Sequence, residues 1–363
     1  MNYSQAHNLR YMLAFSLLSG KEISLFSQDP FESYELAFIE LLTRVTVGSK
    51  AILSKGNRKL DFRPGSIESS DEEVSFDCGK QRAVSYFLEP LFLILPFAKR
   101  RMVVRLEGIT NDSVDLDIDS IKDALLPFLA QALKGAANFD LKVVRRSFRP
   151  SAGGLIFLTV DPTPKTLPKI VVNSKPIKRV RGIAVASKVS TSFLNRMISS
   201  AREVLNEYIP DVWIYSEIVK HNPDNFYGIS LSSDTFLTSG CCFDPMADKE
   251  SGLAPEQLGA TAALRLVDDA LFGSGIVSTS FQSLVFSLMA LTEGQSVIVI
   301  GRVSDHAVTT LRLIKDFFGV SFLFADVEAK QYAEDEEQEN QISSVVKAGC
   351  HGIALRNRFR ETS

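Results

Sequence analysis

Residues 181–197, RGIAVASKVSTSFLNRM, decide the fold of this chain. They begin with an apolar strand around Ile183 and Val185, and a polar turn follows. The hydroxyl groups of Ser190 and Thr191 can accept hydrogen bonds from the free amides of a first helical turn, so a helix is expected to begin there. The stretch therefore predicts a strand that passes directly into a helix, as in an α/β protein.

Strand and helix patterns alternate along the rest of the chain, which predicts an α/β (α+β) fold. Three blocks have similar layouts, at 8–98, 99–180 and 275–356, and the block at 182–274 interrupts them. The expected helices are 33–46, 85–98, 118–134, 192–208, 255–271, 279–292 and 306–318. The expected strands include 22–26, 50–54, 102–107, 141–145, 155–160, 168–173, 211–218, 236–240, 296–300 and 321–325.

The composition bounds the class of protein. A chain of 363 residues with 45% hydrophobic residues can form two domains, each with a buried core. The four cysteines lack the spacing of a metal site, so they are expected to be free thiols in a reducing compartment, and no signal peptide is expected. The longest apolar run, 84–98, contains Glu89 and two prolines and is too short to cross a membrane. We therefore predict a core helix there.

Positive charge is concentrated in one segment of an acidic chain. The net charge is −3, but residues 142–182 contain ten Lys or Arg and a single acid, Asp161. That segment carries +9, so the remainder carries −12. Guanidinium groups suit phosphate, and Gly153 and Gly154 would let backbone approach a ligand. The segment predicts an anion or RNA contact, with a solvated face as the alternative. Its proposed members are Arg145, Arg146, Arg149, Lys178, Arg179 and Arg181.

Motifs spread over some 270 residues resemble the RNA 3'-terminal phosphate cyclase superfamily. The chain is most similar to the non-cyclising eukaryotic branch of that superfamily, which acts in ribosome assembly. Besides residues 181–197, the matching stretches are HNLRYMLAFSLLSGKEI at 7–23, VTVGS at 45–49, FRPGSI at 62–67, VSYFLEPLFLILPFAKRR at 84–101, VVRRSFRPSAGG at 143–154 and LAPEQLGATAALRLVDDAL at 253–271. Their common order and spacing carry the resemblance, because no single stretch is specific.

The resemblance implies a particular fold and domain organisation. Three repeated β-α units, each with a four-stranded sheet, would form a core from residues 1–181 and 275–363. A smaller inserted α/β domain would occupy 182–274. The Asn-x-Arg motif at the N-terminus would add Arg10 to the RNA- or anion-binding residues.

The resemblance also raises the question of catalysis at His306. Active cyclases transfer AMP from ATP, with a divalent metal, onto a histidine in the motif His-x-x-Thr-Asn. Here the motif reads His306-Ala-Val-Thr309-Thr310, and a capping or surface histidine is the alternative interpretation. The glycine-rich loop that frames the nucleotide in cyclases is replaced by YSQAHN at 3–8, which includes His7. Without those glycines a phosphate cannot approach the backbone as closely, so we expect no catalytic residue, cofactor or metal.

A second catalytic alternative is cleavage of precursor ribosomal RNA. In the cyclase-like branch this activity has been attributed to an Arg-Asp-x-Lys cluster, and the matching positions here are Arg312, Leu313 and Lys315. Leu313 replaces the acid, and Asp316 points in another direction on a helix. Arg312 and Lys315 lie three residues apart on one helical face, where they are expected to bind an acidic partner segment or an RNA phosphate. Unpartnered surface charges are the alternative.

The function implied by the resemblance is that of a non-catalytic biogenesis factor for the small ribosomal subunit. It would act in early processing of pre-rRNA within the nucleolar precursor particle. Its expected partners are a ribosome-assembly GTPase, pre-rRNA and proteins of the small-subunit processome, with no membrane contact. An active cyclase using His306, with ATP and a metal, and a pre-rRNA endonuclease are the alternatives.

Overall fold

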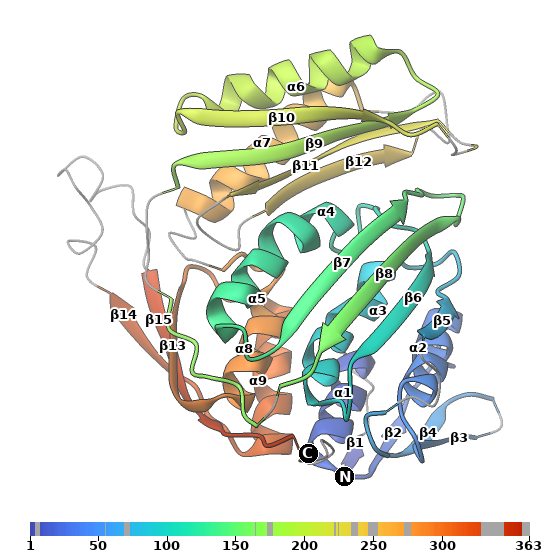
Figure 1. Ribbon diagram of the computed structural model, residues 1–363. Helices are drawn as coiled ribbons and strands as arrows, with labels where there is room; N and C mark the ends of the chain where they lie inside the picture. Colours follow the sequence, from blue (N-terminus) through green and yellow to red (C-terminus); the bar gives the residue numbers. More distant parts are fainter. Residues whose placement is uncertain are drawn as a thin grey trace.

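A computed structural model gives the fold. It describes residues 1–3, 8–54, 56–68, 73–163, 165–172, 177–220, 223, 225–233, 239–245, 253–271, 277–327 and 345–357. These residues form a mixed α/β architecture with four β-sheets, which confirms the predicted fold class. Three sheets lie on the outside of a core whose helices are in the interior, and the fourth sheet lies against one end of this core (Figure 1).

The three core sheets share one strand order. An edge strand runs parallel to its neighbour, and the next two strands are antiparallel. The first sheet has the order β1 (Asn2–Tyr3), β2 (Ile23–Phe26), β4 (Lys59–Arg63) and β3 (Lys50–Leu53), with α1 (Leu9–Ser19) and α2 (Ser33–Arg44). The second has the order β5 (Glu73–Asp77), β6 (Met102–Gly108), β8 (Gly154–Asp161) and β7 (Asn138–Arg145), with α3 (Val84–Ile94), α4 (Ile118–Ser120) and α5 (Leu126–Leu133).

The third core sheet is divided by the insert. Its described strands are β13 (Glu293–Ile300), β15 (Val345–Ile353) and β14 (Leu323–Val327), with α8 (Gln282–Leu291) and α9 (Asp305–Phe318). Val171 occupies the place of the parallel edge strand, because it forms an isolated bridge with Val297. The strand predicted at 168–173 is therefore reduced to this bridge among the residues described.

Strand pairing places the unit boundaries differently from the predicted blocks. β5 pairs with β6, so the second unit begins at Glu73 and not at residue 99. Because Val171 pairs with Val297, the third unit begins before the insert. The prediction failed here because the layout of helices and strands along a chain does not specify which strands pair.

The interior of the core contains helices that are buried on nearly every side. All residues of α3 and of α8 are buried, and nine of the eleven residues of α1 are buried. This confirms the core helix predicted at 84–98, which continues past α3 as a short 3₁₀ turn, Leu95–Phe97. Such helices are surrounded by protein and need no polar face. No helix in the described part of the chain is long and apolar enough to cross a bilayer.

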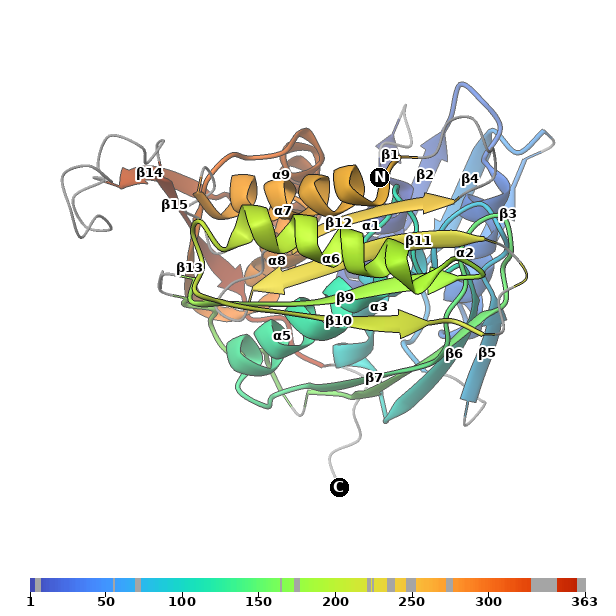
Figure 2. The same cartoon turned by 90° about the horizontal axis from the view of Figure 1, so that it is seen from above.

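The fourth sheet has a hydrophobic cluster of its own. Its order is β10 (Asp211–Ile218), β9 (Arg179–Ser187), β11 (Phe226–Ser233) and β12 (Ser239–Pro245). Both α6 (Thr191–Leu205) and α7 (Pro255–Leu271) cover the face that points away from the core (Figure 2). The other face meets the core, so every residue of β11 is buried. Ser190 caps α6 by accepting a hydrogen bond from the amide of Ser192, as the sequence predicts.

Candidate functional site

The predicted catalytic histidine lies at the start of α9. Ser304 caps this helix by accepting a hydrogen bond from the Ala307 amide, and His306 follows in the first turn. The Nδ1 atom of His306 is 2.7 Å from Ser283 Oγ, and Ser283 Oγ is 3.0 Å from Thr310 Oγ1. Asn8 Nδ2 donates to Thr310 Oγ1 at 3.2 Å. This chain of polar contacts fixes the orientation of the imidazole.

His306 is poised to be neutral at neutral pH. Although its side chain reaches the surface, desolvation by its surroundings lowers its pKa, and the nearby charge of Arg10 lowers it further. The ring also makes an edge contact with Tyr11, at 5.9 Å between ring centroids. A neutral, oriented imidazole is what a nucleophilic histidine needs.

The lowered pKa of His306 predicts a pH dependence of stability. Since the folded-state pKa lies below the ordinary histidine value of 6.5, the unfolded chain binds the proton more tightly. We expect the stability contribution to be present above pH 6.5 and to be lost as the pH falls through the folded-state pKa. Titration of the imidazole by NMR, assigned with His306→Asn, should give a midpoint below 6.5. A midpoint at or above 6.5 would contradict this prediction.

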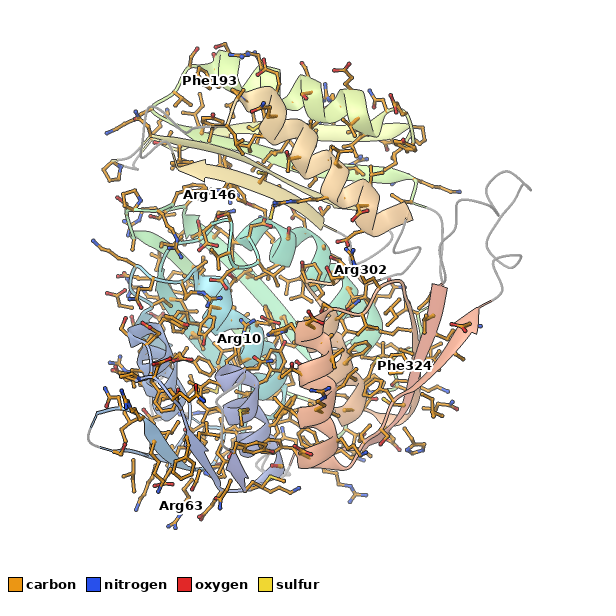
Figure 3. All side chains as sticks on the ribbon, turned by 180° about the vertical axis from the view of Figure 1, so that it is seen from behind. Arg10, Arg63, Arg146, Phe193, Arg302 and Phe324 are labelled. Atoms are coloured by element: carbon orange, nitrogen blue, oxygen red, sulfur yellow. The ribbon has the colours of Figure 1, made fainter. Side chains whose placement is uncertain are left out.

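Arg10 lies beside His306, but it is already paired with an internal carboxylate. Its side chain is only 13% exposed and forms an ion pair with Glu89 at 2.6 Å. The Tyr11 hydroxyl donates to the same carboxylate, and the Arg10 guanidinium lies 4.8 Å from the centroid of the Tyr86 ring. Burial raises the pKa of Tyr11 well above its usual value, so the hydroxyl stays protonated as a donor. Arg10 is therefore held as part of a buried network (Figure 3).

A second neutralised arginine extends this network. Arg82 forms a two-pronged ion pair with Asp115, with its Nε 2.8 Å from Oδ2. Its guanidinium lies 4.5 Å from the centroid of the Tyr86 ring and 5.1 Å from that of Tyr34. Tyr86 is thus enclosed between two guanidinium groups. Arg82 and Asp115 were not predicted from the sequence, because they belong to no recognised motif.

The three arginines that were predicted to form one anion site have different partners within the protein. Arg145 is exposed and donates to the Gly153 carbonyl. Arg149 pairs with Asp112 at 3.1 Å. Arg146 is directed into the junction between the core and the insert, as Figure 3 shows. Each of the three guanidinium groups therefore already has a partner within the protein.

The reason for glycine at one of the two adjacent positions also differs from the predicted one. Gly154 pairs with Gly108 in the sheet, and a Cβ atom there would lie 2.5 Å from the Gly108 carbonyl oxygen. Close strand pairing, and not ligand approach, therefore requires glycine at 154. A Cβ atom on Gly153 would meet open space.

Arg146 connects the core to the insert. Its guanidinium binds both carboxylate oxygens of Asp119 at 2.6 and 2.7 Å and Glu217 of β10 at 3.2 Å. Nearby, Ser230 of β11 donates to Asp117 at 2.6 Å, and burial raises the pKa of Asp117. Phe148 and Phe226 stack at 3.4 Å between ring centroids. This junction fixes the insert on the core. The sequence analysis did not predict its acidic and serine residues, because they lie far from Arg146 along the chain.

The remaining predicted cations lie at the start of the insert. Arg181 binds Asp211 at 2.9 Å, Arg179 lies 3.5 Å from the same carboxylate, and Lys178 is exposed next to them. The structure thus brings Arg179 and Arg181 together about one shared acid, and Lys178 directly precedes them.

The predicted partner-binding pair lies on α9. Arg312 and Lys315 are both exposed, whereas Leu313 is buried at 6% exposure. The helix therefore presents no carboxylate at position 313, and the hydroxyl of Tyr3 is 3.5 Å from Asp316. The cyclase loop replaced by YSQAHN, including His7, lies at positions 4–7 outside the described residues, apart from its ends.

Comparisons with known proteins identify relatives along the whole chain. The family model for RNA 3'-terminal phosphate cyclase matches residues 2–324. The RNA 3'-terminal phosphate cyclase-like proteins of Bos taurus and Homo sapiens are each 32% identical over 372 residues, which cover 98% of this chain and 96% of theirs. The rRNA processing protein rcl1 of Schizosaccharomyces pombe is 28% identical over 333 residues, covering 89% of this chain and 91% of that protein.

One solved structure shows a weaker likeness. It is the EPSP synthase from Acinetobacter baumannii, with a TM-score of 0.13 and 18% identity. The match covers 44% of this chain and 30% of that chain.

Proposed function

Because this chain belongs to the RNA 3'-terminal phosphate cyclase family, we propose that it is a non-catalytic factor in the maturation of small-subunit ribosomal RNA. Its likeness to a fungal rRNA processing protein over nine-tenths of both chains supports this role. We further propose that it acts in the nucleolus, within the early precursor particle and bound to a ribosome-assembly GTPase.

The observation that carries the non-catalytic part is the state of the arginine beside His306 and of a second arginine that packs on the same Tyr86 ring. Arg10 and Arg82 are both paired with internal carboxylates, Glu89 and Asp115. A site that bound a nucleotide triphosphate would need cations to offset its phosphates. These residues do not fit that ligand, because each guanidinium is already neutralised and ordered by a tyrosine ring. The sequence change in the loop at 3–8 points the same way.

Charge reversal on α9 tests the partner proposal. We expect the double variant Arg312→Glu, Lys315→Glu to lose most of the GTPase recovered by affinity purification, because both exposed cations would repel an acidic segment. Lys50→Glu, an exposed cation on β3, is the matched control. Precursor rRNA should accumulate in cells that carry the double variant alone. Normal recovery of the GTPase by the double variant would show that α9 is not the docking surface.

Adenylyl transfer to His306 is the second candidate, because its imidazole is neutral, oriented and at the surface. Incubation with labelled ATP and Mg²⁺ distinguishes it. We expect the protein to incorporate no more label than the His306→Ala variant does. The reason is that the guanidinium groups of Arg10 and Arg82 are both paired with carboxylates and cannot bind the phosphates. A phosphoramide adduct that His306→Ala abolishes would establish the cyclase chemistry. The nuclease alternative is disfavoured, because buried Leu313 removes the carboxylate that would act as base.

A further inference from the structure

The edge strand of the insert carries two exposed aromatic side chains on one face. Trp213 is 53% exposed and Tyr215 is 59% exposed, and their ring centroids are 6.0 Å apart. Large aromatic rings normally contribute to a core, and here the alternate residues Val212 and Ile214 do so. The two rings therefore project from the opposite side of β10, away from the helices that cover the sheet.

Basic residues lie beside these rings. In the parallel pairing of β9 and β10, Trp213 is opposite Arg181, and Asp211 is opposite Arg179. Lys178 precedes Arg179 and is exposed. Asp211 offsets one of these three cations and Glu217 is offset by Arg146, so a positive charge remains next to the aromatic pair. We define the β10 face as Lys178, Arg179, Arg181, Trp213 and Tyr215.

The position of the β10 face keeps it open. β10 is the outer strand of its sheet (Figure 2), and Glu217, further along the same face, reaches Arg146 of the core. The junction thus anchors the end of β10 near Glu217. Tyr215 and Trp213 lie two and four residues back along the strand, and their exposure shows that the core does not cover them.

We propose that the β10 face binds single-stranded RNA by stacking bases on Trp213 and Tyr215. Alternate residues of a strand are about 6–7 Å apart, so two rings on one face can each receive one base. Every base has a flat apolar surface, whereas the sugar-phosphate backbone needs cations, and the β10 face offers both within one pair of strands. A helical duplex hides its bases from such a surface. The inference rests on the proposed role in rRNA processing and names the part of the protein that holds the RNA.

The chain offers a direct probe, because Trp213 is its only tryptophan. A 12-nucleotide single-stranded RNA of mixed sequence should quench its fluorescence, and the same sequence as a duplex should not. In fluorescence anisotropy with the labelled single strand, Trp213→Ala and Tyr215→Ala should each weaken binding roughly 5- to 150-fold. Trp213→Phe and Tyr215→Phe should retain most of the affinity, because a phenyl ring still stacks.

Matched controls separate stacking from misfolding and from charge. Tyr208→Ala removes an aromatic ring of similar exposure, 54%, from the turn after α6, and its affinity should be unchanged. Lys178→Gln should reduce the dependence of log affinity on log salt by about 0.7. Thermal unfolding of each alanine variant should match that of the unmodified protein, since the rings are exposed.

Two outcomes would overturn the proposal. One is unchanged RNA affinity in Trp213→Ala and Tyr215→Ala. The other is unchanged RNA affinity with loss of a protein partner, which would assign the β10 face to a peptide. Either result leaves the proposed function standing if cells depleted of the protein still accumulate precursor rRNA. Normal rRNA maturation in depleted cells, together with quenching of Trp213, would instead reject the proposed function and retain the RNA-binding face.

Discussion

Arg146→Met is expected to lower the free energy of unfolding by about 3–5 kcal/mol. The substitution removes the guanidinium that holds Asp119, whose side chain is 4% exposed, while that of Arg146 is 9% exposed. A buried carboxylate then loses its counter-charge, and desolvation makes that state costly. The link to Glu217 is lost as well, so the insert is expected to be held less firmly. Denaturant unfolding followed by circular dichroism measures the change.

The neighbouring arginine supplies the control. Arg145 is exposed, and Arg145→Met should change the free energy of unfolding by less than about 0.5 kcal/mol. The double variant Arg146→Met, Asp119→Asn should recover part of the loss, because the uncompensated charge is gone. Equal stabilities for Arg146→Met and Arg145→Met would show that the Asp119 ion pair contributes nothing to folding. Charge reversal at Arg146 is for the same reason a poor test of RNA binding.

Glu89→Gln is the second substitution with a large expected effect, about 3–5 kcal/mol of destabilisation. Glu89 is 4% exposed, lies inside α3, and accepts hydrogen bonds from both Arg10 and Tyr11. The glutamine keeps the size of the side chain and can still accept from Tyr11. It cannot offset the charge of Arg10, which is enclosed between the rings of Tyr11 and Tyr86.

An exposed ion pair gives the matching control for Glu89. Glu40 pairs with Arg44 one turn along α2, and both side chains are about half exposed. Glu40→Gln should cost no more than about 0.5 kcal/mol, the usual value of such a surface pair. Thermal or denaturant unfolding of the two glutamine variants compares them directly. If Glu89→Gln were as stable as Glu40→Gln, the Arg10 network would be dispensable for the fold.

Local patterns in the sequence predict much of this fold. Residues 191–205 and 305–318 have one apolar face each, so their helical period is visible, and the first helix begins at the predicted cap, Ser190. α1 was not predicted, because its side chains are apolar on nearly all sides and show no period. β11 was also missed: the alternation Ile229-Ser230-Leu231-Ser232 is short, and in the fold all the residues of this strand are buried on both faces.

The candidate site was less predictable, because charge along a chain does not reveal its partners. Arg146 and Arg149 have the residue type and setting of phosphate ligands, but acids elsewhere in the sequence, Asp119 and Asp112, bind them in the fold. His306 was found through its motif. Trp213 and Tyr215 could have been noticed as an alternation of aromatic and aliphatic residues within 212–215, yet only the exposure of the rings distinguishes them from core residues.

The divided third sheet has a consequence for synthesis on the ribosome. Ile170 leaves the tunnel early, but the serine that accepts its amide, Ser296, follows 126 residues later. At about 5–20 residues per second, this delay is on the order of 6–25 s. During that interval the first two units can fold, while the edge segment at 170–172 has no sheet to join. The last unit closes the molecule only after the whole insert has emerged, so premature termination within the insert leaves the nascent core open.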